Sequence, residues 1–183
     1  MLSSQTRQSS QCSIVKYAGD CGLCGVLSTQ TRQSNCKEIA REHCYKNYLF
    51  HDGVFEVISG LSTLFPESNT IVSSLESKGA DKILGRSELI EGYLDPSLLD
   101  GLLQMGLILL RELYQTSALP NRLVVDIYAK PLPGQKYLAT GHIIEVNEKS
   151  NRLFYEGIIL SEDGSPLLCL SEAEMTHSKS MLD

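Results

Sequence analysis

The pattern of apolar and polar positions predicts one long helix in the middle of the chain. Between Leu98 and Leu110, nine of thirteen residues are Leu, Ile or Met, and they fall on every side of a helical wheel. Asp95 suits the N-cap, and Pro96 suits the first helical position, where its missing N–H costs nothing. We therefore predict a helix from Pro96 to about Tyr114 that is buried on most of its circumference.

Runs rich in Val, Ile, Leu, Tyr and Phe lie on both sides of this helix. Two precede it, at 54–58 and 70–75, and residues 77–92 are typical of a loop. Four follow it, at 122–130, 136–147, 151–161 and 166–175. The breaks between these four runs are short enough to favour hairpins, so we expect an antiparallel meander. The pattern predicts an α+β fold in which a curved antiparallel sheet wraps around one central helix.

The first 48 residues differ in composition from the rest of the chain. They are rich in Ser, Gln, Thr and Cys and contain only short apolar runs. Residues 37–48 have the composition of a short helix. We interpret residues 1–48 as a partly ordered extension and residues 49–183 as the domain.

Five of the six cysteines lie in this extension. Cys21 and Cys24 have the spacing of two ligands on one zinc ion, and Cys36 with His43 or Cys44 would complete the set. The interpretation we prefer is isolated reduced thiols, because the start of the chain has no hydrophobic signal core and no second CxxC or HxxxH pair follows.

Length and charge narrow the range of functions. The 183 residues are 42% apolar and 21% charged, which is enough for one domain with an ordinary core. A net charge of −6 makes nucleic acid and anionic membrane poor partners, since both attract positive proteins. The apolar stretch 102–110 is far shorter than the roughly 20 residues that span a bilayer. We expect a soluble, cytoplasmic protein.

Asp100 and Gln104 are the polar side chains within the apolar run. They are four residues apart and therefore lie one turn apart on one face. Neighbouring leucines would disfavour a charged carboxylate, and a neutral acid can donate a proton to a leaving hydroxyl. The alternative is that Asp100 only interacts with the positive end of the helix. Gly101 and Gly106 are expected where the helix backbone approaches the sheet closely.

The residues from Leu94 to Gln104 (LDPSLLDGLLQ) resemble a known helix motif, His-Pro-x-Leu-Leu-Asp-x-x-x-Gln. It belongs to the second hot-dog of dehydratase domains in polyketide synthases and related polyunsaturated fatty acid synthases. Residues 118–122 resemble the Leu-Pro segment that begins the next strand in this family, 161–164 its DEDG hairpin, and 176–180 its C-terminal tail. The resemblance covers about residues 45–183 and implies a hot-dog fold, either single or half of a double hot-dog.

The resemblance implies removal of water from a 3-hydroxyacyl chain on an acyl carrier protein. In the family a histidine takes the α-proton, an aspartate matched by Asp100 protonates the departing hydroxyl, and a glutamine matched by Gln104 orients that aspartate. The sequence contains no phosphate-binding Gly-rich loop, nucleotide-binding motif or metal-ligand helix, so we expect no metal and no cofactor beyond the phosphopantetheine arm of the carrier. The implied partners are an acyl carrier protein, other synthase domains, and a second hot-dog in a homodimer or pseudo-dimer.

The histidine of the family is the main departure. It lies in an HxxxGxxxxP motif that none of the four histidines of this chain matches. Where the family often has Tyr-Gly-Pro-x-Phe, this chain has HDGVF at 51–55. We therefore select His51 as the candidate base, acting within the chain or across a dimer. His142 lies inside a predicted strand, where a packed or surface role is expected.

Three alternatives to a complete dehydratase stay open. The chain is a fragment or split partner whose base lies elsewhere, or a catalytically incomplete module that binds a carrier or has a structural role. The third is an acyl thioesterase, which typically uses a carboxylate on this same helix. Lys78, Lys82 and Arg86, at four-residue steps, are a candidate docking patch for an acidic carrier, although loops commonly carry such residues.

Overall fold

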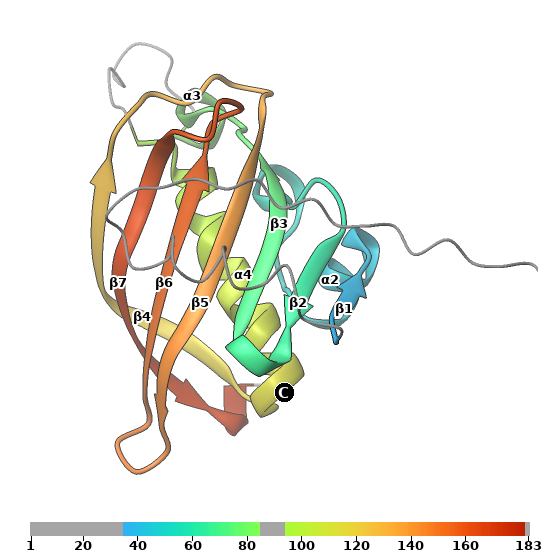
Figure 1. Ribbon diagram of the computed structural model, residues 1–183, viewed down its shortest axis with the longest axis vertical. Helices are drawn as coiled ribbons and strands as arrows, with labels where there is room; N and C mark the ends of the chain where they lie inside the picture. Colours follow the sequence, from blue (N-terminus) through green and yellow to red (C-terminus); the bar gives the residue numbers. More distant parts are fainter. Residues whose placement is uncertain (1–34, 85–93, 182–183) are drawn as a thin grey trace, which may run out of the picture. The chain divides into compact units, whose positions relative to one another are not determined.

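The computed structural model describes residues 35–84 and 94–181 (Figure 1). In this part of the chain, seven strands form one antiparallel sheet in the order β1-β2-β3-β5-β6-β7-β4. The strands are β1 (Lys37–Ile39), β2 (Ser62–Phe65), β3 (Thr70–Glu76), β4 (Ser117–Ile127), β5 (Lys136–Asn147), β6 (Arg152–Leu160) and β7 (Pro166–Ser178). The α-helices are α2 (Arg41–Asn47), α3 (Ala80–Leu84) and α4 (Pro96–Tyr114), and short 3-10 helices are η2 (Gly53–Phe55), η3 (Pro66–Ser68) and η4 (Lys179–Met181).

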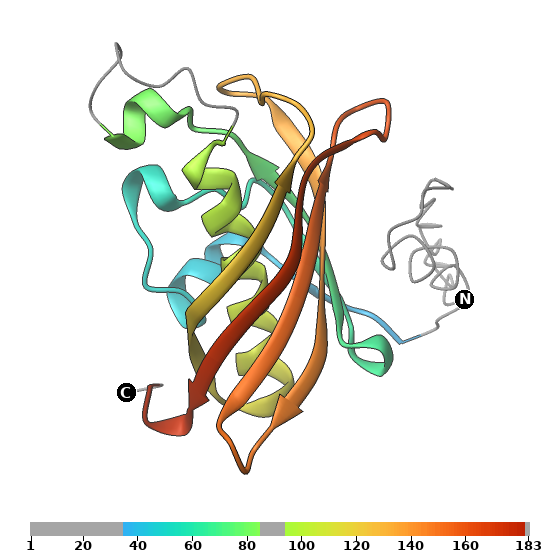
Figure 2. The same ribbon diagram turned by 90° about the vertical axis from the view of Figure 1, so that its left-hand side faces the viewer.

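The predicted central helix is confirmed as α4. Asp95 caps it by accepting a hydrogen bond from Ser97 N at 2.9 Å, and Gln115 ends it in the left-handed conformation with φ 49°. The side chains of Leu98, Leu102 and most later residues of α4 are buried. The sheet curves past the helix and covers one side of it (Figure 2), and Tyr45 and Tyr48 of the N-terminal segment pack against the same core, so the apolar character of α4 is explained by burial on more than one side.

The glycines of α4 lie where the helix meets its neighbours most closely, as predicted. A Cβ on Gly101 would lie 2.8 Å from Val57 Cγ2, and one on Gly106 would lie 3.3 Å from the ring of Tyr155. A larger residue at either position would have to push the helix away or displace the side chain it meets.

Two predictions for the segment before α4 are wrong. Residues 54–58 are not a strand, because Gly53 has φ 58° and starts the 3-10 helix η2. The apolar pattern there reflects buried Val57 and Ile58 at the end of a turn, and Ile58 makes one isolated bridge to Leu75.

The strand β2 was not predicted. The predicted loop at 77–92 contains the short helix α3, and its residues 85–93 lie outside the described residues.

The strands after α4 exist but do not form a simple meander. β5, β6 and β7 are consecutive antiparallel neighbours, as predicted. β4 instead pairs with β7 at the edge of the sheet, whereas β5 pairs with β3 in its middle. The break at 131–134 therefore carries the chain across the sheet instead of turning a hairpin. Pro120 lies inside β4, where an edge strand tolerates its missing N–H.

The domain begins before residue 49, the boundary that composition suggested. β1 pairs with β2, and α2 buries Cys44 completely in the core. The compact unit runs over Asn35–Asp183. Composition was misleading because α2 is short and buries only one side, so most of its residues are polar. The remaining residues of the extension lie outside those described.

The zinc interpretation is tested only in part. Cys21 and Cys24 lie outside the described residues, Cys36 is exposed, and the Cys44 thiol contacts Ser62 Oγ at 3.9 Å. Burial raises the pKa of the Cys44 thiol, which makes it an inert core group. Within residues 35–84 and 94–181, no cluster of three metal-ligating side chains occurs. The same residues include no helix with the length and apolar character needed to cross a membrane.

Candidate active site

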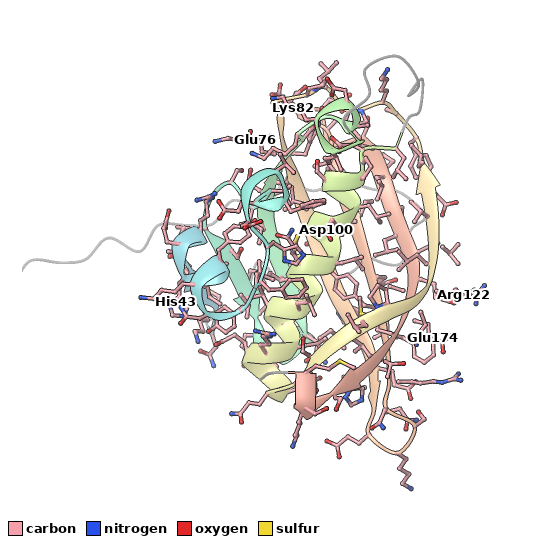
Figure 3. All side chains as sticks on the ribbon, turned by 180° about the vertical axis from the view of Figure 1, so that it is seen from behind. His43, Glu76, Lys82, Asp100, Arg122 and Glu174 are labelled. Atoms are coloured by element: carbon pink, nitrogen blue, oxygen red, sulfur yellow. The ribbon has the colours of Figure 1, made fainter. Side chains whose placement is uncertain are left out.

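The structure brings the three predicted site residues together. His51 Nε2 lies 3.5 Å from Asp100 Oδ2, and Gln104 Nε2 donates to the same oxygen at 2.7 Å. His51 comes from the segment between α2 and η2, while Asp100 and Gln104 come from α4. Asp100 lies on the side of α4 that is turned away from the sheet (Figure 3).

The environment of Asp100 is more polar than the sequence suggested. Its side chain is 28% exposed, and its contacts are an imidazole and an amide instead of leucines alone. Leu99 and Leu103 share this side of α4 and are half-buried, whereas Gln104 is completely buried. The helix therefore presents one carboxylate at the border between core and solvent.

The imidazole of His51 is held mainly by packing. It stacks on the ring of Phe50, with centroids 4.4 Å apart and planes 21° apart, and its side chain is 12% exposed. Nε2 faces Asp100. Nδ1 is buried and has no hydrogen-bond partner among the described residues. An unsatisfied buried nitrogen is uncommon in folded proteins and is often found at functional sites.

Gln104 connects Asp100 to two further segments. Its Nε2 donates to Phe55 O at 2.7 Å, and its Oε1 accepts from the Tyr45 hydroxyl at 3.0 Å. Tyr45 in turn accepts from Ile58 N at 2.9 Å. Burial raises the pKa of Tyr45 to about 12, so its hydroxyl keeps its proton at neutral pH.

Sequence reasoning missed Tyr45. It lies 59 residues before Gln104, in a segment that composition assigned to a separate extension. Apart from its place in a short predicted helix, nothing in the local pattern marks it, so only the folded chain reveals this contact.

The other histidines lie elsewhere. His142 contacts Thr70 Oγ1 at 3.4 Å and pairs across the sheet with Glu156. His43 is exposed on α2, and His177 lies 3.4 Å from a backbone carbonyl. His51 is therefore the histidine that the described structure places beside Asp100.

The suggested docking patch is only partly visible. Lys78 pairs with Glu76 at 2.9 Å. Lys82 is exposed on α3 (Figure 3), and Arg86 lies outside the described residues. A carrier dock at these residues stays a prediction.

The segment that carries His51 and the residues after it expose apolar side chains. Four large hydrophobic side chains between residues 50 and 61 are exposed: Phe50, Val54, Phe55 and Leu61. Phe50, which stacks on the candidate base, is 73% exposed. Apolar surface beside a polar pair is the pattern expected where an apolar ligand or a partner covers the site.

Comparison with known proteins identifies the fold. The dehydratase domain of PpsC from Mycobacterium tuberculosis, solved in complex with C12:1-CoA, matches with a TM-score of 0.61 and 19% identity, over 80% of this chain and 54% of that chain. The dehydratase domain from the CurJ module of the curacin polyketide synthase matches with a TM-score of 0.58 and 12% identity, over 80% and 51%. PaaI from the phenylacetic acid degradation operon of E. coli matches with a TM-score of 0.50 and 10% identity, over 74% and 88%.

These matches confirm the predicted α+β hot-dog fold and the structural resemblance to polyketide synthase dehydratase domains. The chain spans about half the length of the dehydratase structures it matches but most of the length of PaaI. No family model and no curated protein matches the sequence.

Proposed function

We propose that this chain is a hot-dog dehydratase that removes water from a 3-hydroxyacyl thioester carried on an acyl carrier protein. The observation that supports the proposal is the contact of 3.5 Å between His51 Nε2 and Asp100 Oδ2, at the helix position where the dehydratase motif has its aspartate. The histidine differs in sequence position from that of the family, but it lies beside the matched carboxylate.

The proposed reaction needs one base and one acid. His51 Nε2 removes a proton from the carbon next to the thioester carbonyl, while Asp100 protonates the hydroxyl on the following carbon. The C–O bond breaks, a C=C bond forms, and water leaves. His51 ends as an imidazolium and Asp100 as a carboxylate, and at this distance the two charges attract each other. Exchange with solvent, which reaches Asp100, restores the starting protonation.

Gln104 has a supporting role in this scheme. Its N–H bond to Asp100 Oδ2 stabilises the carboxylate that forms when the acid gives up its proton. The exposed side chains of Phe50, Val54 and Phe55 supply apolar surface for an acyl chain.

We propose a second hot-dog as the partner that covers the other exposed apolar side chains between residues 50 and 61. This partner is either another copy of this chain or a neighbouring synthase domain. The half-length match to the dehydratase domains supports this proposal, because it leaves room for a second unit of similar size.

The test is incubation of the protein with a 3-hydroxyacyl carrier protein, with mass spectrometry to detect loss of one water from the acyl chain. We predict that Asp100→Asn lowers kcat at least about 100-fold, because the amide cannot protonate the hydroxyl, while circular dichroism shows an unchanged fold. The control is Asp126→Asn, an exposed aspartate on β4, which should keep full turnover. Full turnover by Asp100→Asn would remove Asp100 from the mechanism.

Hydrolysis of an acyl thioester is the second candidate. Asp100 accepts a hydrogen bond from Gln104 and keeps partial contact with solvent. Solvent can therefore reach the carboxylate, the group that a thioesterase uses to activate water. The same assay separates the two reactions, because hydrolysis releases a free acid and the carrier thiol, whereas dehydration leaves the acyl chain attached.

A further inference from the structure

We infer that Tyr45 is a positioning residue. It fixes the orientation of the Gln104 amide and thereby selects which oxygen of Asp100 carries the acid proton. The inference rests on the proposed function for its catalytic meaning. The hydrogen bonds themselves do not depend on it.

The orientation of Gln104 follows from the groups at the two ends of a hydrogen-bond chain. At one end, Ile58 N–H can only donate, and it occupies a lone pair of the Tyr45 hydroxyl at 2.9 Å. The hydroxyl hydrogen is then free to point at Gln104 Oε1, 3.0 Å away. At the other end, Phe55 O can only accept, so the group facing it at 2.7 Å must be the NH₂ of Gln104.

The reversed amide is unfavourable on both sides. It would bring the amide oxygen against the Phe55 carbonyl and the NH₂ against a hydroxyl whose hydrogen would need another acceptor. Because Gln104 is completely buried, water would not relieve either conflict. The second N–H of Gln104 therefore has to point at Asp100.

The orientation of the Gln104 amide in turn determines which oxygen of the Asp100 carboxyl group accepts a hydrogen bond. Asp100 Oδ2 receives the Gln104 N–H at 2.7 Å and also lies nearest to His51. An oxygen that accepts in this way is the carbonyl oxygen of the neutral acid, so the proton of the acid belongs on Oδ1. Tyr45 thus acts on Asp100 through Gln104, without touching the substrate.

The other charged groups around Asp100 have partners or solvent of their own. From the segment before β2, His51 faces Asp100 directly, Asp52 is exposed, and Glu56 pairs with Arg41 of α2 at 2.6 Å. On α4, the cap Asp95 is bonded to Ser97. The Gln104 bond should therefore make a measurable contribution to how readily Asp100 ionises.

The test is Tyr45→Phe, which removes one hydroxyl. Asp100 ionisation is followed by ¹³C NMR of its carboxyl carbon, identified by its loss in Asp100→Asn, and turnover is measured over the same pH range. Without its hydroxyl partner the amide is oriented by Phe55 O alone, so it holds its N–H on Oδ2 less firmly. The pH of half-ionisation should rise by about 0.5–1 unit and kcat should fall about 10-fold. Tyr114→Phe is the matched control, since the Tyr114 hydroxyl donates to Asn69 Oδ1 instead, and it should change neither value.

A double variant tests whether Tyr45 acts through Gln104. In Gln104→Met the link is already lost, so adding Tyr45→Phe should cause no further shift. An unchanged Asp100 titration in Tyr45→Phe, or an additional shift in the double variant, would overturn the inference. A shifted titration in a protein without turnover would keep the inference and reject the dehydratase.

Should Tyr45→Phe fail to fold, the wild-type chain gives the answer. In ¹⁵N NMR both side-chain amide protons of Gln104 should exchange slowly with solvent, and the signal of one of them should shift on Asp100→Asn. Amide protons that exchange with solvent as fast as those of an exposed glutamine would overturn the inference.

Discussion

The side chain of Tyr155 packs between the sheet and α4. The buried hydroxyl donates to Leu102 O of α4 at 2.8 Å, and burial raises the pKa of this hydroxyl, so it stays a donor. Gly141 lies beside it, and a Cβ there would come within 1.8 Å of the hydroxyl oxygen. The contact of Tyr155 with Leu102 O therefore fixes the distance between α4 and the sheet. This distance places Asp100, on the opposite side of α4, at the border between core and solvent.

We predict that Gly141→Ala lowers the free energy of unfolding by about 2–4 kcal/mol, because the methyl group must displace Tyr155 and break its bond to α4. Urea unfolding followed by circular dichroism measures the loss. Gly60→Ala is the control, since a Cβ on Gly60 meets nothing within 4 Å, and it should stay within about 0.5 kcal/mol. Equal stability of the two variants would show that the backbone at residue 141 shifts enough to accommodate the added methyl group.

At the scale of elements, Glu112 ties the end of α4 to the N-terminal elements. Its carboxylate contacts the Lys37 ammonium of β1 and accepts a hydrogen bond from the Tyr48 hydroxyl at the end of α2. Partial burial opposes ionisation, but the bonds from Lys37 and Tyr48 outweigh it, so the pKa of Glu112 lies below its ordinary value. The same elements that carry Tyr45 are thereby held against the helix that carries Gln104.

The lowered pKa of Glu112 predicts how the stabilisation from its contacts with Lys37 and Tyr48 depends on pH. The stabilisation is complete above the ordinary pKa of a glutamate and is lost as pH falls through the lowered pKa. Glu112→Gln should therefore be less stable than the wild type by about 1 kcal/mol at pH 7, and this difference should close as pH falls through the lowered pKa of Glu112. Urea unfolding from neutral to acidic pH measures it. Glu148→Gln, at an exposed position, should show almost no difference. If the difference in unfolding free energy between Glu112→Gln and the wild type does not change with pH, the charge of Glu112 has no part in the contact.

At the scale of the whole molecule, residues 35–48 complete the domain and the site together. Ile39 and Cys44 are buried in the same core as α4, and Tyr45 reaches Gln104 from this segment. The chain therefore needs its N-terminal elements for stability and for the orientation of the candidate acid.

We predict that a chain of residues 49–183 is less stable than one of residues 35–183 by about 3–5 kcal/mol or fails to fold, because it loses two buried side chains and exposes their neighbours. Thermal and urea unfolding of the two chains compare them directly. Equal stability would mean that β1 and α2 contribute nothing to the core.

Local patterns predicted the parts of the molecule that depend on neighbouring residues. The cap at Asp95 and the dense apolar run were enough to define α4, and runs rich in Val, Ile, Leu, Tyr and Phe located the strands from β5 onward. The pattern was misleading at 54–58, where Gly53 turns the backbone, and in α2, where too few apolar residues mark its buried side.

The sequence by itself determined the central helix, its polar pair Asp100 and Gln104, and most strands, because apolar runs, capping and the short breaks between strands are properties of residues close together in the chain. Only the tertiary structure decided that β4 joins β7, that His51 lies beside Asp100, and that Tyr45 meets Gln104. Each of these contacts joins segments far apart in sequence. Such contacts depend on how the sheet curves past the helix and how the N-terminal segment packs against it, which no local pattern encodes.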